Sequence, residues 1–221
     1  FRTQGWAHFH SVSYRILFSE PADSIRMFTD GKETPASVPS KIHSDKDLKY
    51  HFKFPASDKP LLVKVALSPV DTDGAVKNME SELPEWDFDA TVAQSEQVWN
   101  EALNRVSMTS SDPVVMKNFY TALYHSMIAP FAYQDVDGRY LGMDKQVHTA
   151  EAGYTNYTVF SLWDTFRALH PLMTIIDPAL AADWGKVMVH GYKEGGILPK
   201  WPLASSYTGC MVGYPATSVL A

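Results

Sequence analysis

Residues 153–167 read G-Y-T-N-Y-T-V-F-S-L-W-D-T-F-R, and this stretch decides how the second half of the chain is interpreted. It places the aromatic residues Tyr154, Tyr157, Phe160 and Trp163 beside one carboxylate, Asp164, and one guanidinium, Arg167. Trp and Tyr carry polar atoms that need hydrogen-bond partners when they are buried, so plain aliphatic residues are preferred in a core. Aromatic faces beside a carboxylate fit a ligand with a flat apolar face and hydroxyl groups on its edge. Sugars are ligands of this kind.

A structural interpretation of the same stretch stays open. In that interpretation, Trp163 and the tyrosines are ordinary core residues, and Asp164 caps the helix that follows. Asp is a favoured N-cap residue, because its carboxylate accepts hydrogen bonds from the free backbone N–H groups of the first turn. Both interpretations are compatible with the sequence.

The composition is that of an ordinary globular protein. The chain has 221 residues, of which 45% are hydrophobic and 20% charged, enough to bury a sizeable core. A net charge of −6 argues against a surface for nucleic acid or anionic membrane, and no apolar run approaches the ~20 residues of a membrane span. The single cysteine, Cys210, excludes an intrachain disulfide. The sequence begins without Met and stops within a predicted helix, so we expect it to be part of a longer chain.

Alternating hydrophobicity marks the first part of the chain. Apolar side chains recur at every second position in residues 12–18, 50–54 and 61–67, which predicts strands with one buried face. Short alternating strands joined by turn residues are typical of an antiparallel β-sandwich. Three such strands make only a part of one.

Helical signals follow. Residues 71–82 and 87–106 predict two helices that link the β part to the rest, the second capped by Asp87 or Asp89. Helix starts are marked at Asp112-Pro113, Asp177-Pro178 and Pro215, because a capping residue followed by Pro at the first helical position is a favoured start. Another helix follows Asp164, with a kink or break at Pro171. Residues 131–156 and 197–214 are predicted to be loops.

Several common functional motifs are missing. The D-V-D-G run at residues 135–138 lacks the later ligands of an EF-hand, so a tight turn held by Asx hydrogen bonds is the preferred interpretation. The histidines have no zinc-binding spacing, and no serine lies in a G-x-S-x-G elbow. Nothing matches a P-loop or a dinucleotide fingerprint.

The sequence resembles glycoside hydrolase family 92, the bacterial calcium-dependent exo-α-mannosidases. In the helical half the matching runs are F-Y-T-A-L-Y (119–124), D-V-D-G-R-Y (135–140) with G-M-D (142–144), G-Y-T (153–155), F-S-L-W-D-T-F-R (160–167), G-I-L-P (196–199) with Trp201, and C-M-V-G-Y (210–214). In the first half they are T-Q-G-W-A (3–7), F-S-E-P (18–21), D-G-A (73–75) and W-D-F-D (86–89). The long W-D-T-F-R run is the most specific of them.

The resemblance implies a multidomain β plus α architecture. Residues 1–70 would be the C-terminal part of an N-terminal antiparallel β-sandwich, and residues 71–106 the linker helices. Residues 107–221 would be the first part of an (α/α)6 barrel, truncated at Ala221.

The resemblance also implies an enzyme. It would be a secreted, cell-surface or periplasmic exo-α-mannosidase that releases terminal α-linked mannose from N-glycans or mannans with inversion. A Glu would act as general acid, an Asp would activate water, and Ca²⁺ would bind sugar hydroxyls and help to distort the mannose ring. The acid, the base and most calcium ligands would lie beyond Ala221, in the missing C-terminal part of the barrel, so residues 1–221 alone are expected to be inactive. The alternative is a mannoside-binding relative of the same fold without catalysis.

By the same resemblance, five residues form the wall of the sugar pocket: Trp163, Asp164, Arg167, Trp201 and Cys210. Asp164 would accept hydrogen bonds from sugar hydroxyls, and Arg167 would orient its carboxylate. No catalytic residue and no metal ligand is assigned within residues 1–221. Pro215 departs from the family pattern, where many relatives have His after G-Y, which puts the preferred linkage in doubt.

Overall fold

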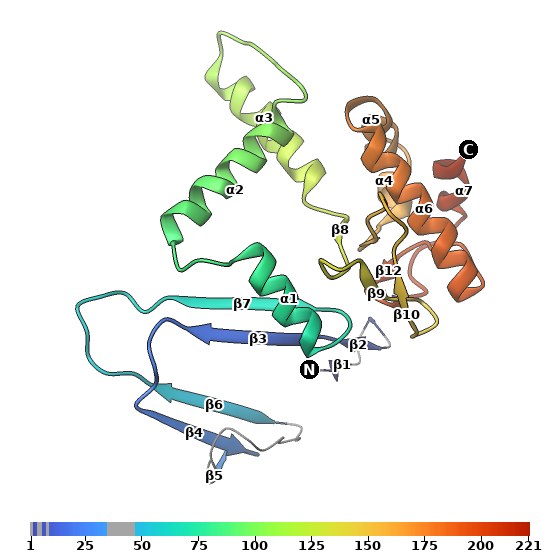
Figure 1. Ribbon diagram of the computed structural model, residues 1–221. Helices are drawn as coiled ribbons and strands as arrows, with labels where there is room; N and C mark the ends of the chain where they lie inside the picture. Colours follow the sequence, from blue (N-terminus) through green and yellow to red (C-terminus); the bar gives the residue numbers. More distant parts are fainter. Residues whose placement is uncertain (1, 4–5, 8, 35–46) are drawn as a thin grey trace. The chain divides into compact units, whose positions relative to one another are not determined.

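The computed structural model describes residues 2–3, 6–7, 9–34 and 47–221 (Figure 1). Antiparallel strands come first and helices follow, as the sequence predicts. The chain divides into two compact units, one formed by residues 16–64 and the other by residues 1–15 and 65–221. The predicted domain limits at residues 70 and 106 remain predictions. Gln4 and Gly5 of the T-Q-G-W-A run lie outside the described residues.

The smaller unit is built on an antiparallel sheet with the order β5-β4-β6. Its strands are β4 (Ser24–Thr29), β5 (Lys32–Thr34) and β6 (Leu48–Lys53). Met27 in the central strand pairs with Thr34 on one side and Tyr50 on the other, and its side chain is buried. Strands β3 (Ser13–Phe18) and β7 (Val63–Ser68) form a second sheet, and the boundary between the two units passes through both.

The buried face of β7 is not the predicted one. Its β-branched and aliphatic positions are exposed, whereas the alternate positions Lys64, Ala66 and Ser68 are buried. In the larger unit, helix α1 (Thr72–Glu82) bonds to the end of this strand, where Asn78 Nδ2 donates to the Leu67 carbonyl at 2.8 Å. The alternation was therefore correct and the predicted burial wrong.

Four aspartates begin helices as predicted. Asp71 caps α1, Asp87 caps α2 (Phe88–Leu103), Asp112 caps α3 (Pro113–Met127) and Asp177 caps α6 (Pro178–Gly195). Each carboxylate accepts a hydrogen bond from a backbone N–H in the first turn, at distances of 2.7 to 3.2 Å. Gly196 ends α6 in the left-handed conformation that a side chain would disfavour.

Short antiparallel ribbons occupy the two predicted loops and the two residues that follow the first of them. The strands are β8 (Phe131–Ala132), β9 (Arg139–Leu141), β10 (Val147–Thr149), β11 (Tyr157–Thr158), β12 (Pro202–Leu203) and β13 (Ser206–Tyr207). They pair as β8–β11, β9–β10 and β12–β13, and β1 (Arg2–Thr3) pairs with β2 (His10–Ser11). Strands of two or three residues are too short to show a period of two, so the loop prediction was wrong for them.

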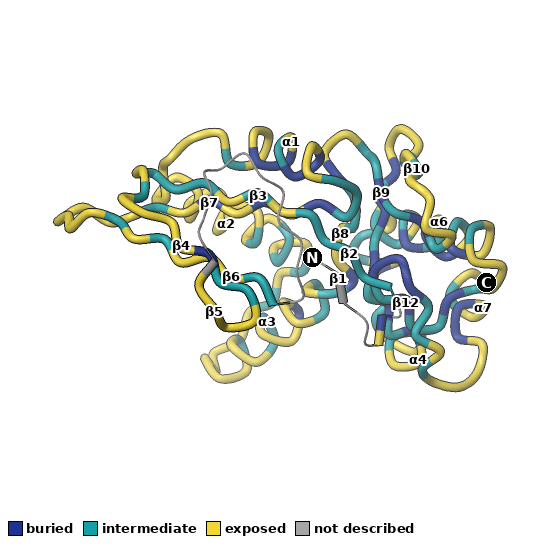
Figure 2. The backbone as a smooth tube through the Cα atoms, turned by 90° about the horizontal axis from the view of Figure 1, so that it is seen from below, coloured by how far each residue is buried: buried dark blue, intermediate teal, exposed yellow. Residues whose placement is uncertain are grey.

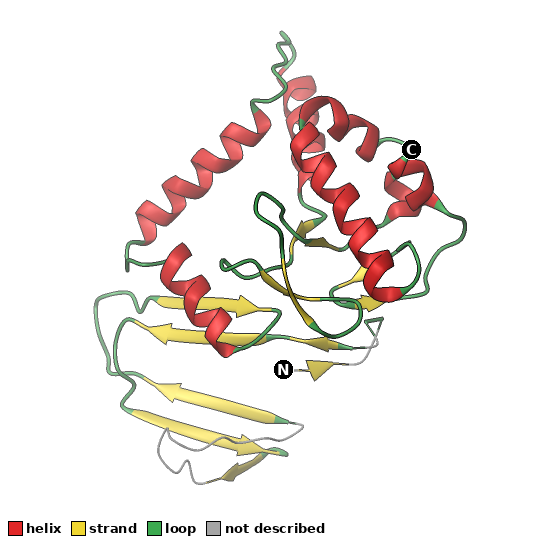
Figure 3. Ribbon diagram, turned by 45° about the vertical axis from the view of Figure 1, so that its right-hand side comes forward, coloured by secondary structure: helices red, strands yellow, loops and turns green. Residues whose placement is uncertain are grey.

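The helix predicted after Asp164 is interrupted before its proline. The structure has α4 (Leu162–Thr165) and α5 (Leu169–Ile176), and Pro171 lies in the first turn of α5, where its missing N–H costs no helical bond. Helix α5 packs against α6, and the last helix is α7 (Pro215–Leu220) (Figures 1 and 3). The break therefore precedes the proline.

The main hydrophobic core lies among these C-terminal helices and the ribbons before them (Figure 2). Its buried members are Tyr154, Phe160, Leu162, Met173, Trp184, Val187, Met188 and Ala216. Helix α2, by contrast, has no buried residue. The core thus holds α4 to the rest of the larger unit through Leu162.

One polar side chain inside this core gives a prediction about pH. His170 is only 5% exposed, its Nε2 has no hydrogen-bond partner among the described residues, and its burial lowers its pKa to about 4. The unfolded chain takes up this proton near pH 6.5 and the folded chain only near pH 4. The free energy of unfolding should therefore keep its neutral-pH value above pH 6.5. It should fall by up to about 3 kcal/mol as the pH drops to 4.

Urea unfolding of the full-length protein between pH 4 and 7 checks this. The His170→Phe variant should lose this part of the pH dependence, and His125→Ala, which changes an exposed histidine, should keep it. If the free energy of unfolding falls equally with pH in the wild type and in His170→Phe, a group other than His170 causes the acid sensitivity.

Candidate functional site

The aromatic stretch divides into buried and exposed members. Tyr154 and Phe160 belong to the core, where they are 6% and 1% exposed. Trp163 is 39% exposed, and Asp164 beside it is also exposed. The core interpretation therefore holds for Tyr154 and Phe160, whereas Trp163 and Asp164 are open to a ligand.

Asp164 does not cap a helix. Helix α4 begins after Ser161 and α5 after Ala168, and Asp164 lies in the first turn of α4. Its carboxylate Oδ2 accepts a short hydrogen bond from the hydroxyl of Ser161. The capping interpretation is wrong, and the carboxylate keeps lone pairs for further donors.

Arg167 contacts the neighbouring aromatic rings. Its guanidinium carbon lies 5.1 Å from the Trp163 ring centroid and 5.0 Å from that of Phe166, within the range of cation–π contacts. Its Nη2 donates to the Trp163 carbonyl at 2.9 Å. The Arg167 guanidinium thus lies on the Trp163 ring. The contact to the Asp164 carboxylate that was predicted for Arg167 is made by the Ser161 hydroxyl instead.

Trp201 lies beside α4. Its indole Nε1 donates to Ser161 Oγ at 2.7 Å, and the Leu162 N–H donates to the Lys200 carbonyl at 3.1 Å. Trp6 meets the half-buried Trp201 ring edge-on, with centroids 5.8 Å apart. Ser161, Trp163, Asp164 and Trp201 are called the α4 site below.

Cys210 is connected to the α4 site only indirectly. Its backbone N–H donates to Thr208 Oγ1 at 3.2 Å, and that hydroxyl donates to the Trp201 carbonyl at 2.7 Å. The half-buried thiol therefore lies on the loop that carries Trp201. The structure brings Asp164 and Trp201 together through Ser161, which no sequence motif marked, and the assignment of Trp163, Asp164 and Trp201 to a sugar pocket remains a prediction.

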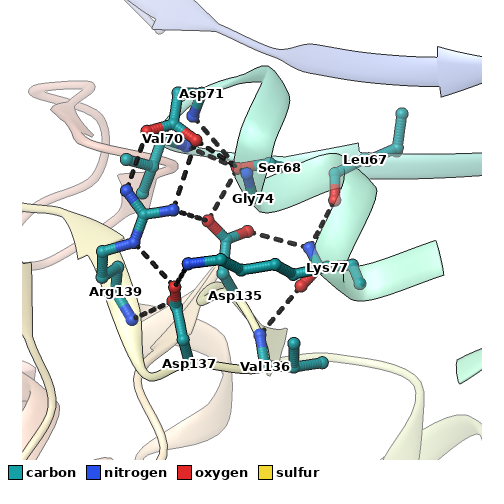
Figure 4. Close-up of polar contacts among 11 residues, drawn as sticks. Leu67, Ser68, Val70, Asp71, Gly74, Lys77, Asp135, Val136, Asp137 and Arg139 are labelled. Atoms are coloured by element: carbon teal, nitrogen blue, oxygen red, sulfur yellow. Dashed lines mark hydrogen bonds and ion pairs between the residues drawn. The ribbon is translucent and has the colours of Figure 1, made fainter. Parts of the chain in front are cut away.

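The D-V-D-G run forms the predicted tight turn and is also a structural junction (Figure 4). The Gly138 N–H donates to the Asp135 carbonyl at 2.8 Å, and the Arg139 N–H donates to Asp137 Oδ1 at 3.2 Å. The buried Asp135 carboxylate accepts from Ser68 Oγ and from Asn78 Nδ2, both at 2.8 Å. Burial raises the pKa of Asp135, and these two hydrogen bonds oppose the rise.

Ion pairs surround this junction (Figure 4). Lys77 of α1 pairs with Asp137 at 2.8 Å, and Arg139 pairs with Asp137 at 2.9 Å and with Asp71 at 2.7 Å. The hydrogen bond from Lys77, joined by those from Arg139, lowers the pKa of Asp137 to about 2. The cluster attaches α1 to the β8–β9 loop, and its polar groups are satisfied by one another, so we assign it a structural role.

One group of possible metal ligands occurs among the described residues: Asp144, His148 and Glu194, whose ligand atoms lie within 4.8 Å of one another. His148 Nε2 is 3.0 Å from Asp144 Oδ2, and Glu194 accepts from the hydroxyl of Tyr140 at 2.8 Å. Calcium takes six to eight oxygen ligands, and an imidazole nitrogen does not provide one. This group does not fit calcium, and hydrogen bonds account for its arrangement: His148 bonds to Asp144, whereas Glu194 accepts from Tyr140 and from the Met143 N–H.

Comparison with known proteins gives consistent matches. Residues 74–221 match the glycosyl hydrolase family 92 catalytic domain. The chain is 35% identical to a family GH92 α-mannosidase from Bacteroides thetaiotaomicron, with a TM-score of 0.90 over 99% of this chain. An inverting GH92 mannosidase from the same bacterium is 24% identical, with a TM-score of 0.84 over 98% of this chain, which shows the fold alone. A secreted glycosidase from Arthroderma benhamiae is 36% identical over 74 residues, or 32% of this chain.

The chain spans only part of these relatives. It covers 30% and 29% of the two bacterial structures and 10% of the fungal protein. Among the described residues, none of the helices has both the length and the apolar character needed to cross a membrane.

Proposed function

Because the chain belongs to glycosyl hydrolase family 92, we propose that the full-length protein is an exo-acting α-mannosidase that removes terminal α-linked mannose from N-glycans or mannans. The observation that carries the proposal is the α4 site. There, an exposed indole, an exposed carboxylate and a second indole lie together on one short helix and the loop beside it.

The α4 site has the chemistry of a sugar pocket wall. A pyranose has an apolar face that packs on an aromatic ring, and the Trp163 ring is available for it. Its hydroxyls are donors, and an ionised carboxylate such as Asp164 is an acceptor only, so the two are complementary. Arg167 lies against Trp163 and limits the positions that the ring can take.

Hydrolysis would proceed with inversion, by a general acid and a general base placed outside residues 1–221. Two carboxyl groups ~6.5–9.5 Å apart leave room for the attacking water, which is the inverting arrangement. The described residues would bind the sugar and hold it in place for that pair. The similarity in fold to an inverting GH92 mannosidase supports this choice of stereochemistry.

We extend the proposal to calcium and to location. Calcium would be required, with most of its ligands outside residues 1–221, since the described residues alone do not provide a calcium site. The protein would act in the periplasm, at the cell surface or outside the cell, in line with the secreted fungal relative.

The proposed architecture follows the family. Residues 1–70 would contribute to a β-sandwich, residues 71–106 would link it to the helical domain, and residues 107–221 would begin an (α/α)6 barrel. The strand-to-helix order of the chain supports this division.

Assay of the full-length protein on aryl α-mannosides and α-linked mannobioses tests the proposal. We expect release of mannose, with β-mannose as the first anomer seen by NMR, and loss of activity in a calcium chelator that added Ca²⁺ reverses. Binding of mannosides without hydrolysis would favour the alternative, a non-catalytic relative. The absence of both binding and hydrolysis would refute the assignment.

Trp163 gives a prediction about ligand binding. Mannoimidazole, which is bound by the GH92 α-mannosidase from Bacteroides thetaiotaomicron, should change the indole fluorescence of the full-length protein. Trp163→Ala should abolish the signal and weaken binding, because the exposed ring loses its contact with the sugar face. Trp86→Ala, which removes another exposed indole, should do neither. Unchanged affinity in Trp163→Ala would show that this residue serves packing alone.

A further inference from the structure

Two of the predicted site residues, Trp201 and Asp164, form hydrogen bonds to the same hydroxyl group, that of Ser161. Ser161 Oγ lies 2.7 Å from Trp201 Nε1 and makes a short hydrogen bond to Asp164 Oδ2. Trp201 and Asp164 come from different segments of the chain, the loop after α6 and the first turn of α4. Their positions relative to each other therefore depend on Ser161.

The direction of these hydrogen bonds follows from the chemistry of the groups. An indole N–H is a donor only, so the Ser161 oxygen must accept from Trp201. An ionised carboxylate is an acceptor only, so the single hydroxyl proton of Ser161 points to Asp164. The order is thus Trp201 N–H to Ser161 O–H to Asp164 carboxylate, and no other assignment satisfies all three groups.

Ser161 has an N-cap position but does not use its side chain as a cap. It is the residue before α4, and its hydroxyl makes no bond to the N–H groups of the first turn. Its carbonyl instead accepts from the N–H groups of Asp164 and Thr165, both at 3.0 Å. These two bonds fix the backbone conformation at Ser161. A serine at the N-cap position usually accepts a hydrogen bond from a backbone N–H of the first turn. Here the Ser161 hydroxyl bonds to the Asp164 carboxylate instead.

We propose that Ser161 is a positioning residue for sugar binding: it holds one oxygen of Asp164, so that the other oxygen and the remaining lone pairs face the sugar hydroxyls. This inference rests on the proposed function. Trp201 fixes the hydroxyl rotor, and the pair sets the carboxylate plane before the sugar arrives. Preorganisation of this kind lowers the cost of ordering a site on binding.

The test uses the full-length protein and a double-mutant cycle with Asp164. Ser161→Ala should lower kcat/KM on α-mannosides and weaken mannoimidazole binding about tenfold, the scale of one hydrogen bond to a charged group. Ser161→Thr keeps the oxygen and should restore most of both. In an Asp164→Ala background, Ser161→Ala should have no further effect on mannoimidazole binding, because it acts through the carboxylate.

The matched control is Ser126→Ala, which removes a hydroxyl that donates to the Leu123 carbonyl within α3 and should leave kcat/KM unchanged. Thermal melts identify any variant that fails to fold; in that case Trp201→Phe, which keeps an aromatic ring but removes the indole N–H and part of the ring, should still lose several-fold in affinity in wild type and distinctly less in Asp164→Ala. An active wild type with an equally active Ser161→Ala would overturn the positioning role alone. A wild type that neither binds nor cleaves mannosides would overturn the proposed function, and this role with it.

Discussion

The Asp164→Ala variant of the full-length enzyme is expected to keep its fold and to lose about 10²-fold or more of kcat/KM on α-mannosides. An ionised carboxylate that accepts hydrogen bonds from sugar hydroxyls contributes ~3 kcal/mol, which corresponds to this loss. The stability of the folded protein should change little, because Asp164 is exposed and caps no helix. Steady-state kinetics and a thermal melt on the same samples measure the two effects separately.

Asp89→Ala is the matched control. Asp89 is also an exposed aspartate in the first turn of a helix, α2, so its removal changes the same charge in the same local setting. Its kcat/KM should equal that of the wild type. An Asp164→Ala variant with near-normal activity and a large loss of stability would return Asp164 to a structural role.

The Gly74→Ala variant is expected to lose about 3 kcal/mol of unfolding free energy. Alanine normally favours a helix interior by ~1 kcal/mol over glycine. At Gly74, however, the added Cβ would lie 2.1 Å from Asp135 Oδ2 and 2.5 Å from Ser68 Oγ. The substitution would displace a buried carboxylate from its hydrogen bonds, and overpacking together with an unpaired buried charge outweighs the gain in propensity.

Denaturant unfolding of Gly74→Ala and Gly185→Ala tests this account of the Asp135 cluster. Gly185 is also helical, but an added Cβ would meet only Leu220 Cδ2, at an ordinary contact distance of 3.6 Å. Gly185→Ala should therefore be neutral or stabilising by up to about 1 kcal/mol. Equal stability of the two variants would mean that Asp135 can move aside at little cost.

Local chemistry explains which parts of the fold could be predicted. The starts of α1, α2, α3 and α6 follow from an aspartate and its neighbours in sequence, because the carboxylate bonds to N–H groups two or three residues later. The D-V-D-G turn is equally local. Such features need no knowledge of the rest of the chain.

The errors have long-range causes. The inward face of β7 carries Lys64, Ala66 and Ser68, and alternation alone does not say which face is covered. The ribbons within residues 131–158 are pairs of two or three residues that no periodicity reveals. The burial of Asp135 depends on Ser68, which lies 67 residues earlier.

In the candidate site, too, the local features could be predicted from the sequence and the long-range contacts could not. Trp163 and Asp164 are adjacent in sequence, so the W-D-T-F-R run was enough to mark them. Ser161 was missed because its role depends on Trp201, 40 residues later. By the family resemblance Arg167 was expected to orient Asp164, whereas the structure places its guanidinium on the Trp163 ring.

A crystal structure of the full-length protein with mannoimidazole tests the central claim most directly. We predict that ring hydroxyls of the ligand lie within hydrogen-bond distance, ~2.5–3.0 Å, of the Asp164 carboxylate. The Trp163 ring should contact the apolar face of the sugar, and the Ser161 hydroxyl should still bond to Asp164 Oδ2. A ligand bound elsewhere, with no contact to Asp164 or Trp163, would contradict the assignment of the α4 site as the wall of a mannose pocket.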